Sequence, residues 1–543
     1  MTVRVPNPVL PGCYPDPSVC RVGDTYYLVT STFEYLPGLP VLRSTDLVSW
    51  EQVGHVVHRP GQLGPGGLDY TGLASSSGLY APTLRHHDGL FWLVCTLVDQ
   101  QDDSRGGHVL LTAEDAAGPW SDPVHLEGVG IDPSLLIDDD GRAWFHATRL
   151  ARDPQWHHQT EVWVRELDLT TRRLVGPEHV IWTGALHGAV WAEGPHLYRV
   201  GDGYLLVAAE GGTEHHHAVC VARADHVTGP YIGNRGNPVL THRHLGHGGD
   251  VVGVGHADLV EAPDGTWWAV LLGMRPYGGY HYPLGRETFL VPVTWEDGWP
   301  VLARGVGRVP TEVEVPGDAW HPGAVQGAVA GPVPSDDLRW CAVRALPTDV
   351  ATPRGTGWDL PLRPAAPAEV EVPAFLGLRL QHHDADLHVT LRTALADGEE
   401  VGLTVRQSER HHVRLAVTPD GRGGLRAAVR HQDGDAEHDL GQAALPGDPA
   451  LPLTLVARVR GVDVDLLAGL GDADPVVVGR ADLRTLDSVA TGGFLGIWLG
   501  VHGASHGRPT TTVAHVDAVT YAPLPPAVSL PVPPALPLLV PPR

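Results

Sequence analysis

Length, composition and charge exclude several classes of protein before any motif is considered. The chain has 543 residues, enough for two or three domains with separate cores, and its 66 glycines and 49 prolines favour a turn-rich β protein over a helical one. The net charge of −25 repels phosphate backbones and anionic lipid, so we expect neither a nucleic-acid partner nor a membrane partner.

The N-terminal segment and the cysteines indicate a cytoplasmic protein. MTVRVPNPVL lacks the apolar core of a signal peptide, and the sequence contains no apolar run of about 20 residues. The five cysteines are odd in number and have no CxxC spacing, which is typical of reduced thiols. The pattern leaves the oligomeric state open, with a homo-oligomer as one option.

Five segments of the first 300 or so residues share one plan. Each has a small or polar residue near proline, an apolar run, a Gly/Asp turn and then an aromatic strand. Gly and Asp adopt positive φ at low cost, so each segment predicts a β-hairpin. The segments are YPDPSVCRVGDTYYLVTS, YAPTLRHHDGLFWLVCT, IDPSLLIDDDGRAWFHAT, AEGPHLYRVGDGYLLVAAE and HADLVEAPDGTWWAVLLG.

The spacing of these segments predicts a five-bladed β-propeller over residues 1–308. Their equivalent positions lie 65, 51, 61 and 63 residues apart. The first strand of each blade lines the central channel of a propeller, so equivalent residues at the starts of those strands meet at one mouth. These residues are Asp16, Ala81, Asp132, Glu193 and His256. Three of the five are acids, which predicts a catalytic site.

A second domain follows the repeat. Residues 309–335 read as a linker, and residues 336–521 contain many short alternating strands with Gly turns, which predicts a two-sheet β-sandwich. Residues 522–543 hold nine prolines among 22 residues and predict an extended Pro-rich tail. The predicted fold class is therefore all-β, a five-bladed propeller followed by a sandwich.

The propeller motifs resemble glycoside hydrolase family 43, the β-xylosidase and α-L-arabinofuranosidase group. The motifs that carry the resemblance are YPDPS, YAPTLRHH, IDPSLLIDDDG, WAEGPHLY, GHADLVE and LGRETFLVPVTWEDGWP. The second domain resembles the concanavalin-like sandwich of β-xylosidases in that family. The resemblance implies inverting hydrolysis of a glycosidic bond, with Asp16 as general base, Glu193 as general acid, and Asp132 as the carboxylate that orients Glu193 and tunes its pKa.

The chemistry of these residues fits the implied roles. Inverting hydrolysis needs a carboxylate that deprotonates water and a carboxylic acid that protonates the leaving oxygen, roughly 6.5–9.5 Å apart. A neighbouring Asp132 disfavours ionisation of Glu193, which keeps the acid protonated. Arg286, in PLGRETFL, would hold Asp16 ionised, although a surface ion pair is the alternative for a lone arginine.

The resemblance also implies substrate-binding residues around the acids. Phe33 matches a position beside the buried sugar, and Thr213 lies with Glu210 and Gly212 in a loop near the acid. Tyr80 departs from the family pattern, in which Trp usually precedes Ala-Pro, and this leaves the preferred pentose open. The resemblance therefore adds Phe33, Tyr80 and Thr213 to the predicted site, together with His256 and Arg286.

No cofactor or catalytic metal is expected. His256 matches a histidine at the funnel floor of family members. The sequence leaves open whether a calcium ion binds near it. The run Asp138–Asp140 lacks the further oxygen ligands of a dedicated calcium loop and is expected to be a solvated turn. Most of the 32 histidines, including His215–His217, are assigned to the surface.

A loop of the sandwich is expected to close the mouth of the site, in or after IWLGVHGASHGRPTTT. His502 or Trp498 is the candidate lid residue, with simple packing inside the sandwich as the alternative. A closed pocket predicts exo-acting release of terminal β-D-xylose, and also of α-L-arabinofuranose, from short oligosaccharides. The alternatives are a mainly α-L-arabinofuranosidase activity and, less favoured, a non-catalytic sugar-binding propeller.

Overall fold

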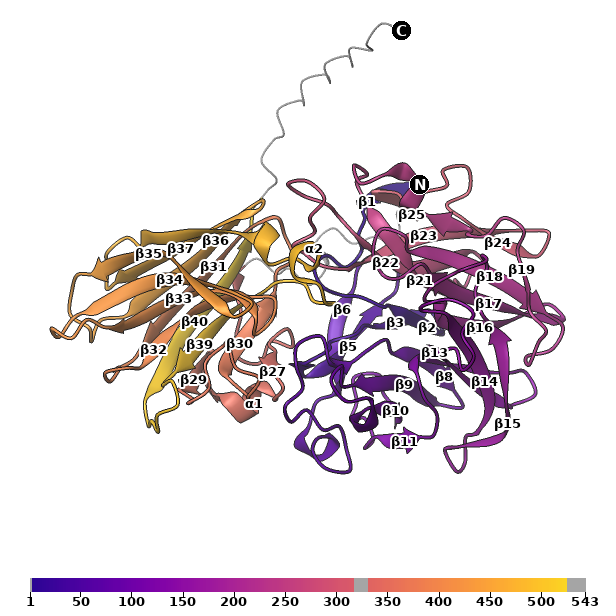
Figure 1. The fold of residues 1–543 in the computed structure, drawn as a ribbon, viewed down its shortest axis with the longest axis horizontal. Coiled ribbons are helices and arrows are strands. Elements are labelled where there is room, and N and C mark those ends of the chain that lie inside the picture. Colours follow the sequence, from indigo (N-terminus) through magenta and orange to yellow (C-terminus); the bar gives the residue numbers. More distant parts are fainter. Residues whose placement is uncertain (1, 317–330, 525–543) are drawn as a thin grey trace, which may run out of the picture.

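The computed structural model describes residues 2–316 and 331–524. Two bodies made almost entirely of strands lie side by side, with the N-terminal half in indigo to magenta and the C-terminal half in orange to yellow (Figure 1). The two α-helices among the described residues, α1 (Pro347–Val350) and α2 (Ser488–Thr491), have four residues each. Neither these nor the short 3₁₀ turns of that part of the chain could cross a membrane. The predicted all-β class is confirmed.

The N-terminal body consists of five antiparallel sheets, each built from consecutive strands. Blade 1 contains β2 (Ser18–Val22), β3 (Thr25–Val29), β5 (Gly38–Ser44) and β6 (Glu51–Val57). Blade 2 contains β7 (Gly78–Leu79), β8 (Thr83–His87), β9 (Leu90–Val98), β10 (Gly107–Ala113) and β11 (Val124–Leu126). Blade 3 contains β12 (Ile131–Ile137), β13 (Ala143–Leu150), β14 (Thr160–Asp168) and β15 (Arg173–Trp182).

The last two sheets repeat the plan. Blade 4 contains β16 (Glu193–Val200), β17 (Gly203–Glu210), β18 (Ala218–Ala224), β19 (Ile232–Gly233) and β20 (Leu240–Thr241). Blade 5 contains β21 (Val252–Glu261), β22 (Trp267–Met274), β23 (Glu287–Glu296) and β24 (Trp299–Leu302). The first strands contact one another in the closed order β2, β8, β12, β16, β21 and back to β2, so the five sheets form a ring.

A polar cluster joins the blades at the centre of the ring. Asp258 is fully buried and accepts hydrogen bonds from Ser18 Oγ at 2.7 Å and from Arg85 Nη1 at 2.9 Å. Arg85 Nη2 also lies 3.2 Å from Nδ1 of His196, and that nitrogen is 2.9 Å from Ser134 Oγ. Each of the five residues comes from the first strand of a different blade. A buried charge requires such partners, so the cluster fixes the starts of these strands relative to one another.

The ends of the propeller are tied together by an additional two-stranded sheet. β1 (Thr2–Pro6) pairs antiparallel with β25 (Glu312–Pro316), which follows the last blade. β25 lies inside the segment predicted as the linker 309–335, and β26 (Gly331–Pro332), near the end of that segment, pairs with a sandwich strand. The predicted linker is thus paired at both described ends, and residues 317–330 lie outside the described residues.

The C-terminal body is a sandwich of two antiparallel sheets. One contains, in spatial order, β28 (Thr352–Arg354), β29 (Gly357–Pro361), β40 (Val513–Pro523), β31 (Asp384–Arg392), β36 (Leu453–Arg460), β37 (Asp463–Leu470) and β38 (Val476–Asp482). The other contains β30 (Ala374–Arg379), β39 (Trp498–Ala504), β32 (Glu400–Arg406), β33 (His411–Pro419), β34 (Leu425–Asp433) and β35 (Ala436–Leu445). Alternate residues of β31 are buried, as period-two patterning requires. The predicted tail starts within β40, and residues 525–543 lie outside the described residues.

Strand pairing and packing dock the sandwich on the propeller. β27 (Ala342–Val343) pairs antiparallel with β4 (Tyr35–Leu36) of blade 1. Trp498 of the sandwich stacks on Tyr35 of the propeller, with ring centroids 3.9 Å apart. One hydrophobic cluster contains Phe33 and Tyr35 from the propeller together with Phe375 and Trp498 from the sandwich. The second domain therefore packs directly behind the residues that surround the mouth of the channel.

Candidate active site

A small pocket at the mouth of the channel contains every residue that the sequence placed in the site. Its volume is about 60 Å³. The predicted lining residues are Asp16, Phe33, Tyr80, Ala81, Asp132, Glu193, Thr213, His256 and Arg286, and the structure adds Ile131, His217 and Phe494. The five equivalent positions of the repeat are all among them, so the ring brings together residues that are up to 240 positions apart in sequence.

Irregular backbone aims the key side chains into the pocket. Asp16, Asp132 and His256 have φ of 55°, 53° and 51°, a left-handed conformation that is uncommon for residues other than glycine. β-bulges interrupt the pairing of the first strand at the corresponding points of blades 3, 4 and 5. Because a bulge re-aims a side chain, and strained backbone is kept where function requires it, these positions mark the site.

Asp16 is held in its ionised form. Its carboxylate accepts hydrogen bonds from Arg286 Nη1 at 2.9 Å and from Ser31 Oγ at 2.6 Å, and His256 Nδ1 lies 3.8 Å away. Burial alone would raise the pKa of Asp16, but Arg286, His256 and the Ser31 hydroxyl outweigh it, and the pKa lies below its usual value. Arg286 therefore makes the contact predicted for it and is not part of a surface ion pair.

Glu193 is held in its protonated form. Removal of its carboxyl group from water, with added repulsion from Asp132 and Asp16, raises the pKa of Glu193 well above its usual value. Burial also raises the pKa of Asp132, whose Oδ2 accepts a hydrogen bond from the backbone N–H of Gly194 at 3.0 Å. The pocket thus favours the ionised form of Asp16 and opposes ionisation of both Glu193 and Asp132.

Three aromatic rings form one wall of the pocket. The ring centroid of Phe33 lies 5.3 Å from that of Tyr80 and 6.0 Å from that of Phe494, and Tyr80 and Phe494 are 5.8 Å apart. The guanidinium of Arg286 lies 5.5 Å from the centroids of both Phe33 and Phe494, and its Nη2 donates to the carbonyl oxygen of Phe494 at 3.3 Å. Phe494 comes from the sandwich, so two domains build this wall.

The prediction of the lid residue was right about the domain and wrong about the residue. Phe494 lines the pocket, and it lies three positions before the first residue of the predicted stretch. Trp498 packs against Tyr35 in the domain interface behind the pocket. His502 is fully buried, and its Nδ1 lies 2.9 Å from Thr404 Oγ1 of the neighbouring strand. Every residue of β39 is buried, so the stretch that contains Trp498 and His502 packs inside the protein, as the alternative of simple packing expects.

His217 is a pocket residue that sequence reasoning assigned to the surface. It is buried, it lines the pocket, and its Nδ1 lies 3.0 Å from the carbonyl oxygen of Gly253. Burial is the main cause that lowers its pKa to about 3, so His217 is neutral. Its position directly before the apolar strand β18 was the signal that separated it from His215 and His216. Glu210 is buried as well, but it accepts a hydrogen bond from Ala185 N and does not line the pocket.

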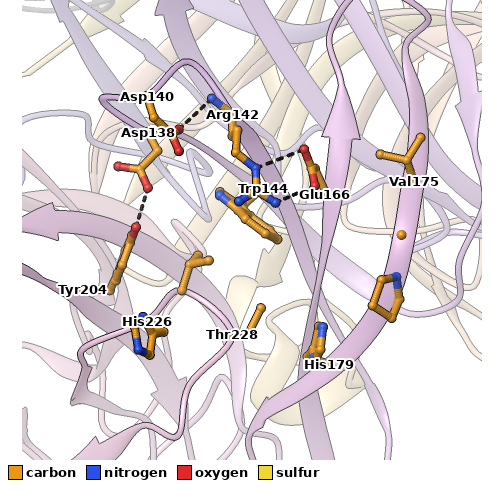
Figure 2. A pocket seen from close by; sticks show the side chains of 13 residues that line it. Asp138, Asp140, Arg142, Trp144, Glu166, Val175, His179, Tyr204, His226 and Thr228 are labelled. Carbon is orange, nitrogen blue, oxygen red and sulfur yellow. Dashed lines mark hydrogen bonds and ion pairs between the residues drawn. The ribbon is translucent and has the colours of Figure 1, made fainter.

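A larger pocket of about 390 Å³ lies between blades 3 and 4, away from the acids (Figure 2). Four of its polar side chains are paired with one another: Asp138 accepts a hydrogen bond from Tyr204, and Arg142 pairs with Glu166 at 2.7 Å. Asp138–Asp140 lie in the turn between β12 and β13, where the sequence placed them. In residues 2–316 and 331–524 no group of three or more His, Cys, Asp or Glu is placed to hold a metal ion, and the calcium ion near His256 stays a prediction.

The ring of five sheets, with three acids and an aromatic wall at its mouth, defines the class of protein as a glycoside hydrolase. Two sequence families match the chain: "Glycosyl hydrolases family 43" over residues 5–300 and "Beta xylosidase C-terminal Concanavalin A-like domain" over residues 334–522. The chain therefore belongs to glycoside hydrolase family 43, and its second domain is of the concanavalin type, as the motifs indicated.

Similar proteins extend over nearly the whole chain. A xylosidase/arabinosidase of Butyrivibrio fibrisolvens is 36% identical over 92% of this chain and 96% of its own length. A non-reducing end α-L-arabinofuranosidase of Bacteroides ovatus is 34% identical over 94% of this chain and 93% of its own length. The crystal structure of a xylan β-1,4-xylosidase from Bacillus halodurans superimposes with a TM-score of 0.87 at 30% identity, covering 95% of this chain and 100% of the other.

Proposed function

We propose that the protein is an exo-acting, inverting glycosidase that releases terminal β-D-xylose from short xylo-oligosaccharides. The observation that carries this proposal is the opposite pKa shift of two carboxyl groups in one pocket, downward for Asp16 and upward for Glu193. Glycosidic hydrolysis by two carboxyl groups requires this pair of protonation states, and the inverting course is the one that the family resemblance implies. A sugar-binding propeller without catalysis has no need for it, which weighs against that alternative.

In the proposed reaction, Asp16 accepts a proton from a water molecule as the water attacks the anomeric carbon. Glu193 donates its proton to the leaving oxygen, so the glycosidic bond breaks and a hydroxyl group forms on the departing sugar. Asp132 orients Glu193 and opposes its ionisation. Arg286 keeps Asp16 ionised through the 2.9 Å contact, and its guanidinium edge is also suited to bind sugar hydroxyls.

Exo action is supported by the shape of the pocket. Phe33, Tyr80 and Phe494 wall it on one side, and its lining also includes the three acids and His256. A small pocket accepts the end of a chain, whereas a polymer bound along its length requires a long groove. We further propose that the enzyme acts in the cytoplasm on imported oligosaccharides.

Proton NMR of xylobiose hydrolysis tests the proposal directly. We expect α-xylose to exceed its equilibrium share at first, because water attacks the face opposite the β-linked leaving group, whereas the departing reducing-end xylose keeps its equilibrium mixture of anomers. Mutarotation should then remove this excess. Xylobiose incubated without enzyme is the control. An initial excess of β-xylose over its equilibrium share would exclude the inverting mechanism, and no hydrolysis would exclude xylo-oligosaccharides as substrates.

A mainly α-L-arabinofuranosidase activity is the second candidate, because one relative is an arabinofuranosidase and another carries both activities in its name. Tyr80, beside Ala81, takes part in the wall that would distinguish the two sugar rings. We expect kcat/KM on 4-nitrophenyl β-D-xyloside to exceed that on 4-nitrophenyl α-L-arabinofuranoside. A rate on the arabinoside far above that on the xyloside would assign the enzyme to the second candidate.

A further inference from the structure

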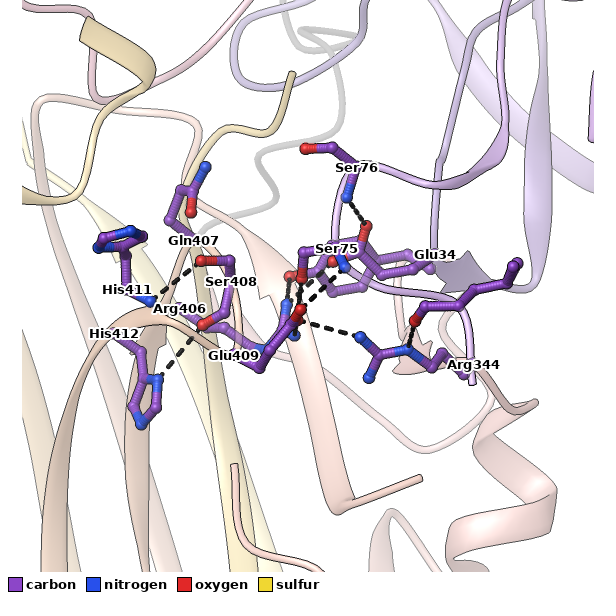
Figure 3. Close-up of polar contacts among 12 residues, drawn as sticks. Glu34, Ser75, Ser76, Arg344, Arg406, Gln407, Ser408, Glu409, His411 and His412 are labelled. Carbon is purple, nitrogen blue, oxygen red and sulfur yellow. Dashed lines mark hydrogen bonds and ion pairs between the residues drawn. The ribbon is translucent and has the colours of Figure 1, made fainter. Parts of the chain in front are cut away.

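A buried ionic network lies in the interface between the two domains (Figure 3). Arg406 of β32, 1% exposed, contacts Glu34 Oε1 and Glu409 Oε2, each at 3.2 Å, and donates to Tyr35 OH at 2.9 Å. Arg344 reaches the same Glu409 at 3.0 Å. Charges this deeply buried are tolerated only when they are paired, so the network fixes the groups it touches.

The network holds one short segment of blade 2 between the domains. Glu409 of the sandwich accepts hydrogen bonds from the backbone N–H of Ser75 at 3.0 Å and from the Ser75 hydroxyl. Glu34 of the propeller accepts from the backbone N–H of Ser76 at 3.1 Å. Both acids that flank Arg406 therefore bind the Ser75–Ser76 segment, and neither contacts a pocket residue through its own side chain in the described part of the chain.

Ser76 connects this segment to the aromatic wall. Its hydroxyl accepts a hydrogen bond from the backbone N–H of Phe494 at 3.0 Å, and its carbonyl oxygen accepts one from Tyr80 OH at 2.7 Å. Phe33 is the direct neighbour of Glu34. Ser76 is thus bonded to wall residues from both domains while its N–H is held by the ionic network.

The backbone of Ser76 shows that this arrangement is imposed on the chain. Its φ is 66°, in the left-handed region, although Ser76 is not a glycine and is 4% exposed. Such a conformation persists only where the surroundings enforce it. A Cβ on Gly493, beside Phe494, would lie 2.6 Å from Ser76 Oγ, so the two loops are in close contact.

We propose that Ser76 is a positioning residue that sets the place of Phe494 in the substrate pocket, and that the Arg406 network holds Ser76 for this purpose. The inference rests on the proposed function, because it assigns the aromatic wall to sugar binding. The Ser76 hydroxyl thereby links the docking of the sandwich to the position of Phe494 in the pocket. Ser76 itself does not line the pocket.

Two substitutions at Ser76 distinguish an effect on the position of Phe494 from an effect on the stability of the protein. Ser76→Ala and Ser76→Gly both remove the hydroxyl that accepts from Phe494, but glycine relieves the left-handed backbone while alanine does not. We expect both variants to raise KM for 4-nitrophenyl β-D-xyloside about 10-fold with kcat changed less than about 3-fold, the signature of lost binding shared by ground and transition states. We expect Ser76→Gly to have a Tm at or above that of Ser76→Ala. A loss of activity that follows the Tm of the two variants would overturn the proposal.

Ser44→Ala is the matched control. Ser44 is also 4% exposed, and its hydroxyl accepts a hydrogen bond from the backbone N–H of Leu47 at 2.9 Å, but it lies in β5 outside the pocket. We expect this variant to lose stability and to keep the wild-type KM. A KM change equal to that of Ser76→Ala would show that any buried serine has this effect and would contradict the proposal.

A double-variant cycle with Phe494→Ala tests whether Ser76 affects substrate binding through Phe494. Once the Phe494 ring is gone, its position no longer matters to the sugar, so adding Ser76→Ala should change KM less than about 2-fold. A full 10-fold further loss in this background would refute the assignment. Calorimetric binding of D-xylose and L-arabinose to the same variants supplies a readout that does not require hydrolysis. It therefore separates a failure of this inference from a failure of the proposed reaction.

Discussion

Glu193→Gln is expected to lower kcat for xylobiose by about 10²–10⁴-fold, the usual contribution of a general acid, with the fold unchanged. Glutamine has the shape of the protonated glutamic acid that the pocket stabilises, so it removes the transferable proton and little else. Substrates with activated leaving groups, such as 4-nitrophenyl xyloside, depend less on protonation and should lose less. Steady-state rates on both substrates measure the two effects, and a kcat for xylobiose near wild type would remove Glu193 from its role.

The same variant has a defined effect on the pH profile. Glu193 acts as the protonated form, and because its pKa is raised, activity falls only as the pH rises through that raised value. Asp16 acts as the ionised form, and because its pKa is lowered, activity falls only as the pH decreases through that lowered value. Glu193→Gln should abolish the alkaline limb of kcat/KM and keep the acid limb. An unchanged alkaline limb would show that another group titrates there.

Glu399→Gln is the control for the glutamine substitution. Glu399 is 6% exposed and accepts hydrogen bonds from the hydroxyls of Thr510 and Thr512 in the sandwich, away from the pocket. Glutamine retains an acceptor oxygen at this position, so we expect a kcat close to wild type and an unchanged pH profile. The control shows whether a buried glutamate-to-glutamine change alone disturbs the enzyme.

The repeat made most of the site predictable from sequence. Asp16, Asp132 and Glu193 occupy equivalent positions in similar hairpins. Because the hairpins are arranged in a ring, residues at equivalent positions lie close together. No comparable rule exists for Phe494, since its contact with the pocket crosses from one domain to another and the sandwich has no repeat in register with the blades. The pairing of β1 with β25 was missed for a similar reason: it joins residues about 310 positions apart, through a segment whose prolines and glycines read as a linker.

The contacts of Arg286 and Ser76 could not be predicted from the sequence pattern alone. The motif around Arg286 predicted its place only through the resemblance, whereas the structure shows its physical partners, Asp16, Thr213 and the Phe494 carbonyl oxygen. Ser76 stands in the run Ser75–Ser77, which reads as an ordinary polar loop. Its role depends on a left-handed backbone and on buried charges contributed by both domains, and neither is encoded by nearby residues.

Asp16→Asn is expected to lower kcat by at least about 10²-fold on both xylobiose and 4-nitrophenyl xyloside, because every substrate requires the water to be deprotonated. This equal loss distinguishes the base from the acid, whose removal spares activated substrates.

The variant also leaves the buried guanidinium of Arg286 opposite a neutral group, so a loss of stability is expected. Its pH dependence follows from the lowered pKa of Asp16: the ionised form stabilises the wild type above the pKa of the unfolded chain, and this stability is lost as the pH falls through the folded-state value. The Tm difference between wild type and Asp16→Asn should therefore be largest near neutral pH and shrink on acidification. A difference independent of pH would show that Asp16 is not ionised in the folded protein, and a kcat within about 10-fold of wild type would exclude it as the base.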